Sequence, residues 1–131
     1  MQAGSSYQTP LRRARGLGAA KTGLSSFIAE RVSGVALAPL SLWAIWAVLT
    51  HARDGYDGAV RLLSSPVHAT LAVLMIGVSF QHMRLGMKVI LEDYIQKTSS
   101  KFALMLLNTA VCVLGAAVAI VSILKVAFAA A

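Results

Sequence analysis

The sequence predicts an all-α membrane protein that crosses the bilayer with three helices. Hydrophobic residues make up 57% of the 131 residues and charged residues only 13%, whereas about a quarter of the residues of a soluble domain are charged. The mean hydropathy of +0.71 comes mostly from three apolar stretches. Each is close to the ~20 residues that a helix needs to cross ~30 Å of hydrocarbon. A soluble fold is therefore excluded, and one compact membrane domain is expected.

The N-terminal segment, residues 1–26, is polar and basic and has no apolar period. We expect an extended cytoplasmic arm that is retained, because the apolar run after it starts too late and is too long for a signal peptide. The first span is predicted at about residues 32–49. It contains Pro39, which predicts a kink, and carries Trp43 and Trp46 toward its far end, where indole rings favour the membrane interface.

Residues 50–65 separate the first two spans. The pairs Asp54-Gly55 and Asp57-Gly58 are typical of turns, so we expect a loop with a short interfacial segment.

The second span is predicted at residues 66–93, because Ser65-Pro66 is a common helix start. A charged link follows, and the third span is predicted at about residues 102–128. Residues 27–131 are thus expected to form a three-helix transmembrane domain.

The net charge of +7 comes from basic residues that flank the apolar spans. They lack the interleaved aromatic residues of a nucleic-acid surface, so nucleic acid is excluded as a partner. Seven of them lie on the side of the N terminus and the second link, and three on the other side, which places the N terminus in the cytoplasm by the positive-inside rule. The seven are Arg12, Arg13, Arg15, Lys21, Arg31, Lys97 and Lys101, and the three are Arg53, Arg61 and Lys125.

A histidine inside the second span is the first candidate for chemistry. His82 lies about 16 Å along the helix axis from Asp93, well inside the hydrocarbon, where an ionisable side chain is costly. At ~100° per residue, His82, Gly86, Val89 and Asp93 share one helix face. The glycine leaves the gap that a flat macrocycle needs, and haem iron accepts an imidazole ligand. Spacing alone leaves open that His82 only bonds to a neighbouring helix and that Gly86 only allows close packing.

A second axial ligand is not expected from this chain. His68 lies about 21 Å from His82 along the same helix, and His51 follows the first span at the opposite membrane face. Both are interpreted as interfacial, so another chain or a small ligand must complete the iron. Cys112, the single cysteine, cannot alone form a disulfide or hold an iron–sulfur cluster.

Three residues near the cytoplasmic membrane face are further candidates. Tyr94 can donate a hydrogen bond to a quinone carbonyl, with Asp93 supporting it, although an aromatic-belt tyrosine beside a solvated acid has the same sequence. Arg31 suits a haem propionate as well as a topogenic role. Arg84 and Lys88 project away from the His82 face and are assigned no chemistry.

Taken together, these positions resemble a known family. His82, Gly86-Met87 and Asp93-Tyr94 match the H-x3-G-M-x5-D-Y signature of the hydrophobic membrane anchor of succinate dehydrogenase, the small cytochrome b or D subunit. Residues 18–23 and 30–34 are similar to the G-S-A-K-S-G and Q-R-V-T-G segments of its alphaproteobacterial and mitochondrial-type members, with Ala19 in place of serine and Glu30 in place of glutamine. The resemblance covers roughly residues 16–128.

The resemblance implies a complex in which a flavoprotein subunit oxidises succinate and an iron–sulfur subunit passes electrons to ubiquinone, in a bacterial inner membrane. His82 would be one axial ligand of haem b, with a companion cytochrome b anchor subunit supplying the other in a two-chain helix bundle. Tyr94 would bond the quinone, Asp93 would support it, and Arg31 would approach a haem propionate. This chain alone would catalyse nothing.

Other functions remain as alternatives. The nearest is a fumarate reductase anchor that oxidises quinol, which the sequence separates poorly from a succinate dehydrogenase anchor. A small transporter subunit would need a continuous polar path, and the third span offers little beyond Asn108, Thr109, Ser122 and Lys125. A structural assembly factor without a ligand would leave the burial of His82 unexplained.

Overall fold

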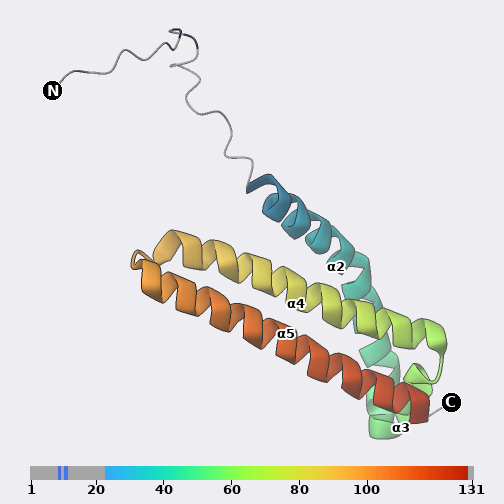
Figure 1. The fold of residues 1–131 in the computed structure, drawn as a ribbon. Coiled ribbons are helices and arrows are strands. Elements are labelled where there is room, and N and C mark those ends of the chain that lie inside the picture. Colours follow the sequence, from blue (N-terminus) through green and yellow to red (C-terminus); the bar gives the residue numbers. More distant parts are fainter. Residues whose placement is uncertain (1–8, 10, 12–22, 130–131) are drawn as a thin grey trace.

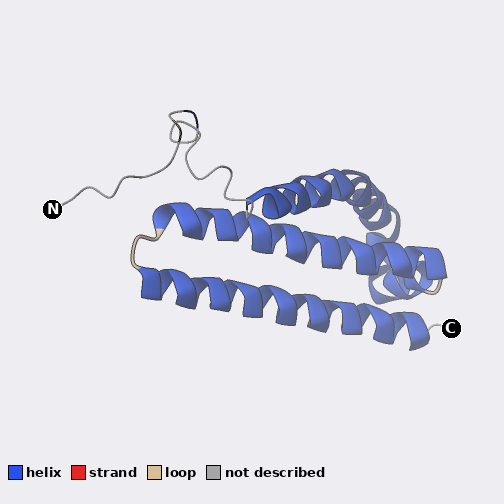
Figure 2. Cartoon of the chain, turned by 45° about the horizontal axis from the view of Figure 1, so that its top comes forward, coloured by secondary structure: helices blue, strands red, loops and turns tan. Residues whose placement is uncertain are grey.

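The computed structural model describes residues 9, 11 and 23–129, so most of the expected arm lies outside the described residues. Three long helices dominate the chain: α2 (Gly23–His51), α4 (Pro66–Tyr94) and α5 (Thr98–Ala129). A 3-10 turn, η1 (Ala52–Asp54), and a short helix, α3 (Gly55–Leu63), connect the first two (Figure 1). The described elements are all helical (Figure 2), which confirms the all-α prediction.

Helix α2 extends beyond the first predicted span at its N-terminal end. It begins at Gly23 and therefore includes Glu30 and Arg31, which the apolar pattern placed at the border of the span. A helix does not have to end where its apolar residues end, because polar turns can continue into the headgroup region. Pro39 lies inside α2, and the axis of the helix bends along its length (Figure 2), as expected when a proline removes a backbone hydrogen bond.

The connection between α2 and α4 is more helical than the turn-forming pairs indicated. Gly55 has a positive φ of 56° and turns the chain after η1, as the first pair predicted. Gly58, in contrast, lies inside α3, where a Cβ atom would stand 2.2 Å from the carbonyl oxygen of His51. The second glycine is thus a packing residue that brings α3 against the end of α2, and the prediction of a turn there was wrong.

Helix α4 begins as predicted, with Pro66 in its first turn. It ends at Tyr94, and α5 starts only a few residues later at Thr98, so the link is shorter than the charged segment suggested. Lys101 Nζ donates a hydrogen bond of 2.8 Å to the carbonyl oxygen of Glu92. This bond ties the first turn of α5 to the last turn of α4, where free carbonyl groups favour a cation.

The long helices lie in a row with α4 in the middle. Within the described residues, α4 contacts both α2 and α5, while α2 and α5 do not contact each other (Figure 1). Few side chains are buried as a result: Ser33, Ala47, Leu85 and Cys112. Large apolar side chains are exposed on every long helix, among them Phe27, Val35, Leu42, Leu74, Met87, Phe102, Leu114 and Phe128. Such a surface fits lipid or other membrane helices, not water.

Close packing between α4 and α5 rests on a glycine and an amide. A Cβ atom on Gly115 would lie 2.6 Å from Cε1 of Phe80, so the phenyl ring occupies the space that a side chain would need. Asn108 Nδ2 donates a hydrogen bond of 3.0 Å to the carbonyl oxygen of Arg84. Small residues and interhelical polar bonds are the usual means of holding helices together in lipid.

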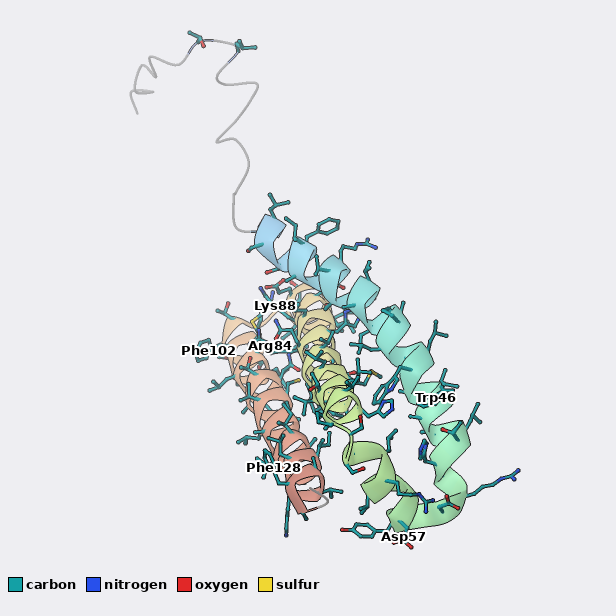
Figure 3. The ribbon with its side chains drawn as sticks, turned by 90° about the vertical axis from the view of Figure 1, so that its right-hand side faces the viewer. Trp46, Asp57, Arg84, Lys88, Phe102 and Phe128 are labelled. Carbon is teal, nitrogen blue, oxygen red and sulfur yellow. The ribbon has the colours of Figure 1, made fainter. Side chains whose placement is uncertain are left out.

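Two helical segments are long and apolar enough to cross a membrane, Leu24–Leu63 and Thr98–Ala129. Helix α4, with 29 residues, is long enough but is not one of them, because polar residues such as His68, Gln81 and His82 lower its hydropathy. Figure 3 places Arg84 and Lys88 toward one end of the molecule and Asp57 at the other.

Candidate functional site

His82 lies on the face of α4 that meets α2. Its Nδ1 atom is 2.9 Å from Oγ of Ser33, one of the few buried polar residues, with 8% of its surface exposed. A Cβ atom on Gly34 would lie 3.4 Å from Cε1 of His82, so the glycine next to Ser33 lets α2 approach the imidazole closely. The histidine is thus held from α2 by a hydrogen bond and by contact with the backbone.

A pocket of about 490 Å³ opens beside this histidine. It is lined by His82 from α4 and, from α2, by Glu30, Arg31, Gly34, Val35 and Ala38. The structure therefore brings together two of the residues that the sequence singled out, His82 and Arg31. The Arg31 side chain is exposed, and its guanidinium carbon lies 5.2 Å from the centroid of the Phe27 ring, an arrangement typical of a cation–π contact.

Gly86, one turn after His82, faces open space. No atom of the described residues would lie within 4 Å of a Cβ atom there. The close packing with a neighbouring helix of this chain, which the spacing left open as an explanation for this glycine, is not seen. The space is available to another molecule.

Asp93 and Tyr94 end α4, on the side of the molecule where α2 begins. Both are exposed, Tyr94 to 78%, and within the described part of the chain neither side chain makes a hydrogen bond or an ion pair. They are separated from His82 by about 16 Å of helix. The structure does not bring them together with His82, and any shared role would need a ligand or partner that reaches both levels.

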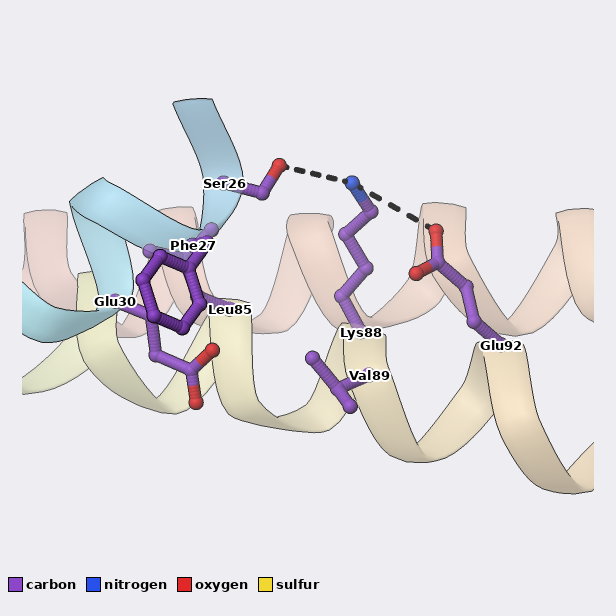
Figure 4. A pocket seen from close by; sticks show the side chains of 7 residues that line it. All are labelled: Ser26, Phe27, Glu30, Leu85, Lys88, Val89 and Glu92. Atoms are coloured by element: carbon purple, nitrogen blue, oxygen red, sulfur yellow. Dashed lines mark hydrogen bonds and ion pairs between the residues drawn. The ribbon is translucent and has the colours of Figure 1, made fainter. Parts of the chain in front are cut away.

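A second pocket, of about 500 Å³, lies between α2 and the last turns of α4 (Figure 4). Lys88 Nζ lies 3.4 Å from Ser26 Oγ and 3.7 Å from a Glu92 carboxylate oxygen at its rim. No chemistry was assigned to Lys88 from the sequence, so its contact with α2 was not predicted. The side chains that line the pocket are Ser26, Phe27, Glu30, Leu85, Lys88, Val89 and Glu92.

The other two histidines lie at the opposite end of the helices, among tryptophans. The indole of Trp43 donates a hydrogen bond of 3.3 Å to Nδ1 of His68, and the two rings stack. The Trp46 ring forms a T-shaped contact with His51 and a tilted contact with His68. This aromatic cluster agrees with the interpretation of both histidines as interfacial residues.

The surroundings of His82 fit a haem better than a metal ion held by protein ligands only. No group of three or more His, Cys, Asp or Glu side chains that could hold a metal ion occurs in the described ranges. A haem needs only axial ligands from protein because its macrocycle supplies the others. One imidazole, a pocket with an arginine at its rim, and open space at the glycine one turn away match that requirement.

Comparison with known proteins identifies the family. The family described as succinate dehydrogenase/fumarate reductase transmembrane subunit matches residues 5–117. The chain belongs to this family. Together with the two helical segments that are able to cross a bilayer, this membership makes it a membrane protein, and the resemblance to succinate dehydrogenase anchors is confirmed.

Individual relatives from the same family cover most of the chain. It is 27% identical over 108 residues to the succinate dehydrogenase hydrophobic membrane anchor subunit of Rickettsia conorii, which is 82% of this chain and 86% of the relative. It is 25% identical over 117 residues to the subunit with the same description from Rickettsia typhi, which is 89% of this chain and 94% of the relative. No solved structure matches the chain.

Two residues of the site fall in the family-like segment 30–34 but were given no role from the sequence. Ser33 and Gly34 lie 48 or more positions before His82, and serine and glycine are common in membrane helices. Only the packing of α2 on α4 shows that they contact the imidazole.

Proposed function

We propose that this chain is one of two membrane anchor subunits of a bacterial succinate dehydrogenase and that it helps to bind haem b and ubiquinone. The observation that carries the proposal is the placement of His82. The imidazole is held by Ser33 beside a pocket that Arg31 also lines, and Gly86 leaves open space one turn away.

In this proposal His82 is an axial ligand of the haem iron, and Gly86 gives clearance to the macrocycle. Arg31, at the rim of the same pocket, pairs with a propionate through charge-assisted hydrogen bonds. Haem b, when bound, supplies a centre that accepts and releases one electron. The second axial ligand comes from a companion cytochrome b anchor subunit, whose helices cover the exposed apolar faces of α2 and α4.

The quinone site is proposed at the end of α4. Tyr94 donates a hydrogen bond to a carbonyl oxygen of ubiquinone, and Asp93 supports this contact. Their exposure supports the proposal, because a side chain that completes a site with partner subunits must be free to reach them. The iron–sulfur subunit docks at this face and carries the flavoprotein subunit, which oxidises succinate. The anchor has no catalytic activity by itself.

We further propose that the chain crosses the inner membrane three times with its N terminus in the cytoplasm. Helix α4 runs between two helices that are able to cross a bilayer, and its 29 residues reach about 43 Å. It connects the α3 end of the molecule to the link before α5, so it must cross if α2 and α5 cross. The charged residues of this helix lie in the half that ends at Tyr94. Glu92 and Asp93 are at its end, and the long side chains of Arg84 and Lys88 can snorkel toward the headgroup region.

A fumarate reductase anchor that oxidises quinol is the second candidate. The family description covers both enzymes, so family membership does not separate them. The relatives described above are named as succinate dehydrogenase anchors, which supports the first assignment. A transporter subunit is less well supported, because the exposed apolar faces of this row of helices leave no enclosed polar path within the described residues.

The experiment that tests haem ligation is a dithionite-reduced minus oxidised visible spectrum of the complex purified in detergent. We expect a b-type α-band in the native complex that is lost or shifted in the His82→Ala variant. His68→Ala is the matched control, because it removes an imidazole from the same helix at the opposite end and is expected to leave the band unchanged.

A band that survives in His82→Ala with its native position would overturn the assignment of the ligand. Absence of haem from an intact native complex would leave a haem-free quinone-binding anchor. The quinone part is then tested separately with Tyr94→Phe, which is expected to slow quinone reduction by the complex while haem content stays constant.

A further inference from the structure

We propose that Ser33 fixes the tautomer of His82, so that Nε2 carries the lone pair that binds iron. This inference rests on the proposed role of His82 as a haem ligand. Ser33 is thus a positioning residue: it acts on the iron only through the imidazole.

The Ser33 hydroxyl carries a single proton and can donate only one hydrogen bond. Ser33 Oγ lies 2.9 Å from the carbonyl oxygen of Glu30 and 2.9 Å from Nδ1 of His82. A carbonyl oxygen can only accept a hydrogen bond, whereas a hydroxyl donates one and can accept two. Serine in a helix commonly donates to the carbonyl three or four residues earlier. The hydroxyl proton is therefore directed to Glu30, and Oγ presents a lone pair to His82.

Because Ser33 Oγ accepts this hydrogen bond, Nδ1 of His82 must carry the proton that is donated. In a neutral imidazole only one nitrogen carries hydrogen, so Nε2 is left with the free lone pair. A metal-bound histidine usually donates its other ring N–H to an acceptor in this way, which fixes the ring and makes the ligand more basic. The hydroxyl of Ser33 is buried, so water does not compete for this bond.

His68 provides the contrast within the same helix. The indole nitrogen of Trp43 can only donate, and it lies 3.3 Å from Nδ1 of His68. Nδ1 of His68 therefore accepts, and its Nε2 carries the proton. The two histidines of α4 are thus held in opposite tautomers by α2, and of these two His82 is the one that presents an unprotonated Nε2.

Gly34 adds the steric part of the arrangement. A side chain at this position would touch Cε1 of the imidazole, the carbon between the two ring nitrogens. The glycine lets α2 come close enough for the Ser33 bond to form.

The test compares Ser33→Ala with Ser33→Thr and with Ser26→Ala in the complete complex. Thr keeps a hydroxyl at the same place. Ser26 lies two turns earlier in α2 and bonds Lys88, so Ser26→Ala removes a hydroxyl that does not touch His82. Two properties are measured: the rate at which haem passes to an excess of apomyoglobin, and the midpoint potential of the haem.

We expect Ser33→Ala to lose haem 10- to 100-fold faster, the usual effect of removing an outer partner of a metal ligand. Its midpoint potential should rise, because a less basic imidazole stabilises ferric iron less. Ser33→Thr and Ser26→Ala should behave as the native complex. If Ser33→Ala does not assemble, Ser33→Cys takes its place, since a thiol keeps the volume but accepts a hydrogen bond weakly.

The tautomer proposal is overturned if Ser33→Ala, or Ser33→Cys in its place, retains the native haem-loss rate and potential while His82→Ala loses the haem. The proposed ligand then stands without the positioning residue. If His82→Ala also keeps native haem, the proposed assignment of His82 as the haem ligand fails, so the two failures are distinguishable.

Discussion

At the residue scale, the contact between Gly115 and Phe80 shows how one missing side chain sets the distance between two membrane helices. The phenyl ring of α4 lies where a Cβ atom of α5 would stand. Lipid provides no hydrophobic force that pushes helices together, so van der Waals contact at such points carries much of the association. The addition of one methyl group here should therefore change the stability of the helix contact.

We expect Gly115→Ala to lower the thermal stability of the assembled complex, with a cost of about 1–3 kcal/mol for the overpacked contact. The Cβ atom would be 2.6 Å from Cε1 of Phe80, and the ring must move. Phe80→Leu removes the atoms that clash, so the double variant should recover part of the loss in a melting experiment. Gly77→Ala is the control, because no described atom lies within 4 Å of its Cβ position. An additive double variant would contradict this account.

The residues of the candidate site were predictable only where the sequence carries a local pattern. His82 and Gly86 stood out because a polar residue in an apolar helix is costly and a glycine one turn away shares its face. Arg31 was placed at a membrane border by charge alone, and the structure adds that it lines the same pocket as His82. The contacts of Ser33 and Gly34 with His82 could not be predicted, because contacts between helices depend on their crossing geometry, which no spacing within one helix encodes.

At the element scale, the contact between α4 and α5 includes a polar bond away from the link, in addition to the Lys101 bond beside the link. Asn108 donates to the carbonyl oxygen of Arg84, and its Oδ1 lies 3.5 Å from Sγ of Cys112. A side-chain amide in a membrane helix costs free energy when it has no hydrogen-bond partner on a neighbouring helix. The bond therefore also fixes the register of the two helices.

We predict that Asn108→Leu destabilises the pairing of α4 and α5 only modestly, by about 0.6 kcal/mol and at most about 1.7, the range measured for such bonds in membranes. Ser122→Ala is the matched control, because its hydroxyl bonds only the carbonyl of Val118 in its own helix. The melting temperature of the purified complex is the readout. A large loss of stability, or complete failure to assemble, would mean that Asn108 has a further partner.

The sequence predicted an element boundary correctly at a proline but wrongly at a glycine, because glycine has two structural roles. Pro66 starts α4 because its ring fits the first turn of a helix. Gly55 and Gly58 follow aspartates in the same way, yet the first turns the chain and the second packs α3 against α2. The two roles have the same sequence signature, and only the tertiary contact with His51 separates them.

At the scale of the whole molecule, a row of three helices leaves most apolar surface uncovered. Helix α4 is the only one of the long helices with neighbours of this chain on both sides in the described structure, and even its face at Gly86 remains open. A closed three-helix bundle would bury that face. The arrangement suits a chain that completes its packing with lipid on some sides and a companion subunit on others, which composition alone could not indicate.

The same row makes the topology testable. The α3 end and the link before α5 lie at opposite ends of α4, so they must lie on opposite sides of the membrane if α4 crosses it. We expect an Asp57→Cys variant to react with an impermeant maleimide in right-side-out membrane vesicles, and a Lys97→Cys variant to react only in inside-out vesicles. Both carry Cys112→Ala, which removes the buried native thiol of α5. The native chain itself should react from neither side.

Two contrary outcomes would have different meanings. Labelling of both positions from the same side would show that α4 does not cross, and the interior position of His82 would then have to be abandoned. Exchange of the two labelling patterns would keep three crossings but place the N terminus outside. The quinone proposal would then fail too, because Tyr94 and the surface that the iron–sulfur subunit needs would face away from the cytoplasm, whereas the His82 environment, which lies within the span, would be unaffected.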